Sequence, residues 1–149
     1  MIRALALLVR DDRGSMAIET AFVAPVLLLL SLGGFEVSQM VAGQTELQSA
    51  AAEAAAVVRA VAPETTGERN TVRSIIANST GLTTSQVSVR EVYRCGTNSQ
   101  YTDNADYCGS GPTNTFIRVR LNDTYTPIWA NYGVGSGFNY HVVRFVQIG

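Results

Sequence analysis

The chain has 149 residues, of which 46% are hydrophobic and 15% charged, and its formal net charge at pH 7 is −1. All 11 of its basic residues are arginines, and they form no basic run or patch in the sequence. This composition argues against nucleic acid as the main partner. The length allows one domain of moderate size beside an N-terminal apolar segment.

Residues 1–14 form a short leader that is basic overall and ends at Gly14. Its apolar stretch, residues 4–9, is shorter than the roughly 7–15 residues of a secretory signal's hydrophobic region. The long apolar run comes after Gly14 instead. We therefore do not expect the leader to be an ordinary secretory signal peptide.

Residues 14–35 form the apolar run, and Glu19 is their only charged residue. As an α-helix, they would rise about 33 Å, which matches a hydrocarbon core of about 30 Å. Pro25 lies inside the run and is tolerated in a membrane helix, where neighbouring groups re-satisfy the freed carbonyl. A carboxylate at the bilayer centre costs roughly 2.5–3.5 kcal/mol, so Glu19 is a functional candidate. The arginines of the leader place the N-terminus in the cytoplasm, and residues from Glu36 onward outside.

Residues 44–62 are predicted to continue this helix beyond the membrane. They are rich in alanine, glutamine and glutamate, with apolar side chains at helical spacing, and Pro63 and Gly67 end the pattern. We therefore expect a helix of more than 40 residues that is apolar all round in its first half and amphipathic in its second. The expected domains are the leader, the helix at 15–62 and an outer domain at 63–149.

The outer domain carries the signals of one short helix and three strands. The helix is expected at 71–78, ended by Gly81, and the strands at 87–90, 117–122 and 138–148. We predict an α+β fold in which a small three-stranded antiparallel sheet packs on the outer half of the long helix.

Cys95 and Cys108 are the two cysteines of the chain. Outside the membrane they predict one disulfide that closes a polar loop, whereas in the cytosol a lone pair would more often be free thiols. The chain has no CxxC motif and no histidine next to either cysteine, so we expect no redox role.

No constellation in the sequence predicts an enzyme, a cofactor or a metal site. His141, the only histidine, lies in a predicted strand and reads as a packed or surface residue. Asp103, Asn104 and Asp106 fail the EF-hand spacing and lack its closing glutamate, so they read as a polar loop. The C-terminal tyrosines and Trp129 could form an adhesive or sugar-binding surface, although core filling and sheet propensity explain most of them.

The sequence RGSMAIE at residues 13–19, followed by Pro25 and the apolar run 26–30, resembles the processing site and first helix of a type IV pilin-like subunit. More narrowly, it resembles the TadE-like pseudopilins of bacterial tight-adherence (Flp/Tad) pili. Gly33 with Glu36, and the residues at 44–56, stand where that family carries a glycine-x-x-glutamate and a glutamine- and alanine-rich continuation.

The resemblance implies a processing step and an assembly contact. A prepilin peptidase would cut after Gly14 and leave Ser15 as the new N-terminus. Glu19, the fifth residue after the glycine, would pair with the freed amine of a neighbouring subunit, and Glu36 could be a second assembly contact. The alternative to an assembly role is that Glu36 is simply solvated where the helix leaves the membrane. Tad-type sites usually have an aromatic residue directly after the glutamate, where this chain has Thr20.

Three hypotheses follow. The first is a minor pseudopilin in the bacterial inner membrane, with a periplasmic outer domain and with prepilin peptidase and other Tad pilins and pseudopilins as partners. The second is an uncleaved bitopic anchor whose outer domain binds an envelope partner. The third is a secreted domain, cut by signal peptidase near residues 41–43. The mature N-terminus would be Ser15, Met1 or a residue near Gln44, respectively.

Overall fold

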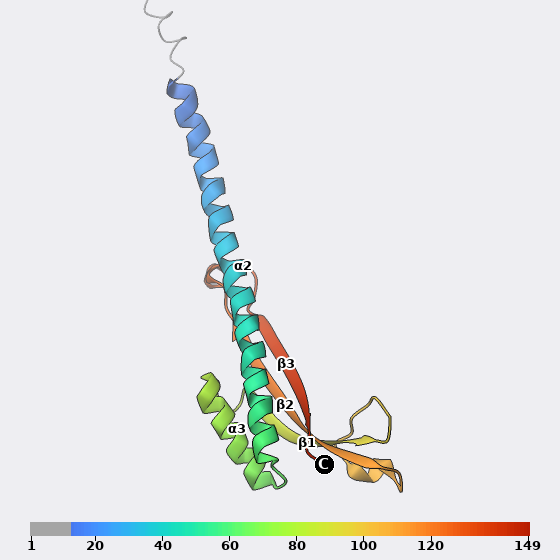
Figure 1. Cartoon of the computed structure of the whole chain (residues 1–149). Helices are drawn as coiled ribbons and strands as arrows, with labels where there is room; N and C mark the ends of the chain where they lie inside the picture. Colours follow the sequence, from blue (N-terminus) through green and yellow to red (C-terminus); the bar gives the residue numbers. More distant parts are fainter. Residues whose placement is uncertain (1–12) are drawn as a thin grey trace, which may run out of the picture. The chain divides into compact units, whose positions relative to one another are not determined.

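The computed structural model describes residues 13–149, so most of the predicted leader lies outside the described part of the chain (Figure 1). Two helices are followed by three strands, and two short 3-10 turns lie between the strands. In chain order they are α2 (Arg13–Val61), α3 (Thr66–Thr80), β1 (Val87–Cys95), η1 (Ala105–Cys108), β2 (Thr113–Tyr125), η2 (Ile128–Tyr132) and β3 (Phe138–Gln147). The predicted α+β fold is confirmed.

The chain divides into two compact units, Met1–Gln39 and Met40–Gly149. The described part of the first unit consists of helix α2 alone. The second unit contains the rest of α2, helix α3 and the sheet. The outer half of α2 thus belongs with the sheet that it covers.

Helix α2 runs through Pro25 without interruption, as the sequence predicted, and comprises 49 residues. It ends where expected, just before Pro63. The main chain of Ala62 has a positive φ of 45°, and its N–H still donates to the carbonyl of Val58 at 2.8 Å. A proline one or two residues after the helix end cannot continue the helix, which explains the stop.

The core of the second unit lies between α2 and one face of the sheet. Small and branched side chains of α2 meet the alternating apolar residues of the strands, and α3 adds three side chains, those of Val72, Ile76 and Ala77. The main contributors are Leu47, Ala51, Ala54, Val58, Val72, Ile76, Val87, Ile117, Val119, Leu121, Val142 and Val146. Because alanine has a short side chain, the helix axis can approach the sheet closely.

The sheet is antiparallel with the strand order β1-β2-β3, so β1 and β3 are both edge strands. Strands β1 and β2 are longer than the sequence predicted. Polar residues adjoin the apolar alternation, after it in β1 and on both sides of it in β2, so the alternation alone did not predict the strand ends. Cross-strand pairing, which continues as far as Cys95 opposite Thr113, sets the strand length instead.

Helix α3 begins five residues earlier than predicted, so the expected bounds of 71–78 were too narrow. Its first turn is stabilised by a capping box. The hydroxyl of Thr65 accepts from the N–H of Glu68 at 3.2 Å, and the Glu68 carboxylate accepts from the N–H of Thr65 at 3.0 Å. The prediction treated Gly67 as a helix breaker and overlooked this motif. Gly81 ends the helix as predicted, with a left-handed φ of 71°.

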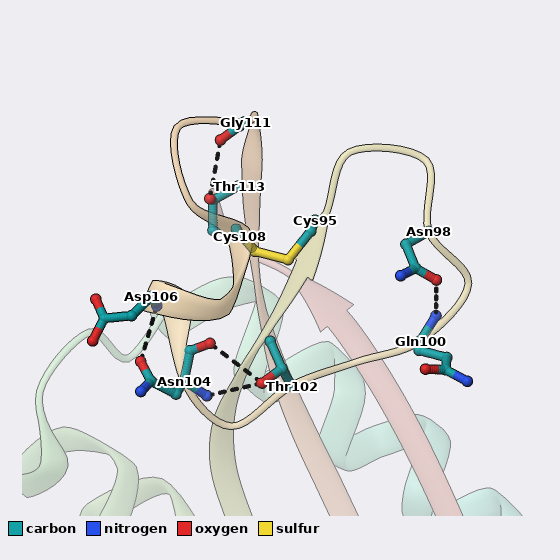
Figure 2. Close-up of a disulfide and its surroundings, with 9 residues drawn as sticks. All are labelled: Cys95, Asn98, Gln100, Thr102, Asn104, Asp106, Cys108, Gly111 and Thr113. Atoms are coloured by element: carbon teal, nitrogen blue, oxygen red, sulfur yellow. Dashed lines mark hydrogen bonds between the residues drawn. A yellow bond between two sulfur atoms is a disulfide. The ribbon is translucent and has the colours of Figure 1, made fainter.

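Cys95 and Cys108 form the predicted disulfide, with a Cα–Cα distance of 5.0 Å (Figure 2). The bond joins the end of β1 to the turn η1 and closes a polar loop. Inside that loop Asn104 caps η1, because its side-chain oxygen accepts from the N–H of Asp106 at 2.9 Å. Asp103 pairs with Arg118 at 3.3 Å. The polar-loop interpretation of these residues is therefore confirmed.

Candidate functional site

The predicted processing site lies at the start of α2. The described part of α2 starts at Arg13, so the peptide bond between Gly14 and Ser15 lies in its first residues.

Glu19 lies one turn beyond Ser15 on the same face of α2, because residues four apart in a helix are neighbours. Its side chain is exposed, and no salt bridge within residues 13–149 involves it. If the chain were cut after Gly14, the amine of Ser15 and the positive end of the helix dipole would both favour a carboxylate here. Ser15 and Glu19 thus lie one turn apart on one face of α2, and the pairing of Glu19 with the amine of a neighbouring subunit stays a prediction.

Thr20, which stands in place of the usual aromatic residue, bonds back to its own helix. Its hydroxyl donates to the carbonyl of Met16 at 2.8 Å. A hydroxyl satisfied in this way leaves no unpaired polar group on an apolar helix. The departure at this position therefore leaves the helix suited to an apolar environment.

The apolar half of α2 presents large side chains to its surroundings in every direction. Phe22, Leu28, Leu29 and Leu30 are 74%, 71%, 70% and 67% exposed. The helix is long and apolar enough to cross a membrane, and none of its most apolar window is buried within the protein. A continuous apolar surface of this kind requires lipid or other helices to cover it. The N-terminal helix thus suggests membrane anchoring.

Glu36 differs from Glu19, because its side chain is 0% exposed and takes part in an interaction. The assembly contact that the resemblance implies stays a prediction for both glutamates.

The remaining candidates are distributed over the outer domain and do not converge on one site. His141 is an exposed strand residue whose Nδ1 lies 2.7 Å from the side-chain oxygen of Asn122. Tyr101 stacks on Phe145, with ring centroids 4.0 Å apart, so it serves as packing. In the described part of the chain no cluster of three or more acidic, histidine or cysteine residues is arranged to hold a metal ion.

The structure brings three arginines together, although the sequence predicted no basic patch. Arg90 in β1 lies directly opposite Arg118 in β2, and Arg120 follows two residues along the same strand. Residues two apart in a strand share a face, so the three arginines lie together on the face that α2 does not cover. The alternation of Arg118 and Arg120 was visible in the sequence, but the register that adds Arg90 was not.

Comparison with known proteins gives one match. The family of TadE-like proteins matches residues 14–56, which begin at the predicted processing site and end within the outer half of α2. No curated protein and no solved structure matches the chain. The match covers the helix that carries Glu19 and leaves the sheet outside it. It confirms the resemblance stated from the sequence: residues 14–56 are similar to TadE-like proteins, a family related to the Tad pilus system.

Proposed function

We propose that this protein is a minor pseudopilin, a structural and assembly subunit of a tight-adherence pilus rather than an enzyme. The observation that carries the proposal is the coincidence of three features in one segment. The TadE-like match, the exposed apolar run at 14–35 and Glu19, the single carboxylate of that run, all fall within residues 14–56.

In this proposal a prepilin peptidase cuts the precursor after Gly14 and removes the basic leader. The new N-terminus, Ser15, lies in the inner membrane, and the domain that contains the sheet lies in the periplasm. The positive-inside rule supports this orientation, because the arginines of the leader precede the apolar helix. The disulfide also supports it, because disulfides persist in the periplasm and are rare in the cytosol.

Glu19 is proposed to hold the subunit in register with its neighbours. Its exposed carboxylate would pair with the Ser15 amine of an adjacent subunit when their apolar helices pack together. Each charge then reduces the desolvation penalty of the other, whereas either one alone in lipid is unfavourable. Partners of this chain are thus other pilins and pseudopilins of the same system.

Two variants test the proposal in cells that make the pilus. Gly14→Leu should leave uncut precursor in the membrane, as seen by electrophoretic mobility and by N-terminal sequencing of the protein. Glu19→Ala should still insert, because it removes an unfavourable charge from the apolar run. It should no longer co-purify with other pseudopilins, because the partner amine loses its counter-charge.

Glu53→Ala is the matched control, because Glu53 is an exposed glutamate of the same helix outside the apolar run. The processed fraction must be measured alongside assembly, since a change near the cut site can slow cleavage. Full piliation by a processed Glu19→Ala protein would contradict the assembly role. A mature N-terminus at Met1 would instead support an uncleaved membrane anchor, and one near Gln44 a secreted domain.

A further inference from the structure

Strand β1 has one edge that no other strand covers. The N–H of Asn122 donates to the carbonyl of Gln86 at 2.9 Å, so even-numbered residues direct their main-chain groups toward β2. Tyr93 shows the opposite direction, because it exchanges hydrogen bonds of 2.7 and 2.8 Å with Thr102 on the outer side. Alternation along the strand therefore points the N–H and C=O groups of Val89 and Glu91 outward.

These outward groups form a short free edge, which we define as the main-chain N–H and C=O of Val89 and Glu91. Within residues 13–149 none of the four has a hydrogen-bonding partner. The carbonyl of Val87 bounds the edge at one end, since it accepts from Nε of Arg73 at 2.8 Å. Thr102 bounds it at the other end. Four unpaired main-chain groups in a row are a template for another strand.

The free edge borders an open groove of about 720 Å³ between α3 and β1. Arg69 and Arg73 reach this groove from α3, and Arg90 reaches it from β1. The hollow follows the strand, since residues 87–91 all line it. An extended chain could therefore lie along β1 in this groove.

The charges around the free edge are predominantly positive. Arg69 is neutralised by Glu91 at 2.9 Å, and Arg118 by Asp103 at 3.3 Å. Arg73 and Arg90 take part in no salt bridge within the described residues. Arg90 and Arg118 also lie directly opposite each other, and like charges in that arrangement destabilise a sheet. The arrangement becomes favourable when acidic side chains are added beside it.

A second copy of this chain does not supply those acidic side chains. The only carboxylates in the three strands are Glu91, which is already paired with Arg69, and Asp123, which lies in the central strand. Two β1 edges paired through the free groups would set Val89 opposite Glu91 and therefore Arg90 opposite Arg90. Repulsion between these arginines disfavours such a dimer. The fitting partner is a different polypeptide.

We propose that the free edge of β1 receives an extended acidic segment of a partner protein, which adds to the sheet as a fourth strand. Main-chain hydrogen bonds to Val89 and Glu91 would provide affinity, as in other cases of strand addition. Acidic side chains of the segment would lie beside Arg90 on one face and near Arg73 on the other. This inference goes beyond the proposed pilus role and does not depend on it.

The test uses the full chain in non-ionic detergent micelles and a fluorescent synthetic peptide of alternating glutamate and valine. Fluorescence anisotropy measures its affinity, with alternating lysine–valine and glutamine–valine peptides for comparison. We expect the glutamate peptide to bind most tightly and its affinity to fall as salt is raised. Arg90→Glu should weaken it by about tenfold or more, whereas Arg144→Glu on the exposed part of β3 should leave it within about twofold.

Val89→Pro separates the main-chain contribution from the charge contribution. The N–H that proline removes points outward, so the ladder to β2 is retained and the fold should persist, as circular dichroism can verify. Binding of the glutamate peptide should then fall by about tenfold or more, since the added strand loses its donor.

Four results would overturn the proposal. Equal binding of all three peptides would show that the charge of the peptide does not determine its affinity. Unchanged binding by folded Val89→Pro would show that the peptide does not use the free edge. Self-association of the full chain that Val89→Pro abolishes would assign the edge to a second copy instead. Failure to bind any peptide would show that the edge receives no added strand, and the role of Arg90 would then be to protect this edge strand from aggregation.

Discussion

Removal of the Cys95–Cys108 disulfide is expected to destabilise the outer domain substantially. The two cysteines are 13 residues apart in sequence. In the chain-entropy model, closing a loop of this size in the unfolded chain contributes about 3 kcal/mol to the free energy of unfolding. The variant Cys95→Ala/Cys108→Ala should lose about that amount.

The native loop has other anchors, so the loss should arise mainly in the unfolded chain. Tyr93 and Thr102 exchange two hydrogen bonds, and Tyr101 stacks on Phe145. These contacts do not need the disulfide, and they should hold the loop in place in the folded double variant.

Thermal unfolding of the full chain in micelles, followed by circular dichroism, measures the effect. In domains of roughly 60–100 residues 1 kcal/mol moves the midpoint by about 4–8 °C, so we expect a fall of roughly 12–24 °C. Chemical reduction of the wild-type chain should give the same midpoint as the double variant. An unchanged midpoint in the double variant would refute the loop-closure reasoning. Two reactive thiols in the unreduced, denatured protein would place the domain in the cytosol.

Four further changes probe the core packing, the capping box of α3 and a hydrogen bond between β3 and α2. Ala54→Leu should destabilise the domain by about 1–3 kcal/mol, since the added atoms have no room between α2 and the sheet; an unchanged urea midpoint would contradict this. Thr65→Ala should cost about 1 kcal/mol of stability by the same urea measurement, because the N-cap of α3 is lost. Hydrogen bonds from the main chain of Thr65 and Glu64 lower the pKa of Glu68 below its ordinary 4.5, so its contribution is complete above pH 4.5 and should disappear as the pH falls through the lowered pKa; a pH series on Glu68→Gln should lack this loss. Tyr140→Phe should cost about 1 kcal/mol, because its hydroxyl donates to the main chain of α2 at 2.9 Å, and equal stability of this variant would show that the bond contributes nothing.

The sequence by itself determined the features that depend on local pattern. A single carboxylate in a long apolar run, followed by small and apolar residues at helical spacing, was enough to predict helix α2 and to single out Glu19. Alternation at residues 117–122 predicted the central strand. The physical reason is that helical and strand periodicity are properties of neighbouring residues, which the sequence shows directly.

Tertiary structure alone decided what depends on pairing between distant residues. The burial of Glu36 and the stacking of Tyr101 on Phe145 could not be read from local pattern. The strand ends and the grouping of Arg90 with Arg118 follow from the register between β1 and β2. A shift of one residue in that register would place these arginines on opposite faces. Their grouping therefore depends on the register, which is set by the burial of the apolar face of each strand in the core.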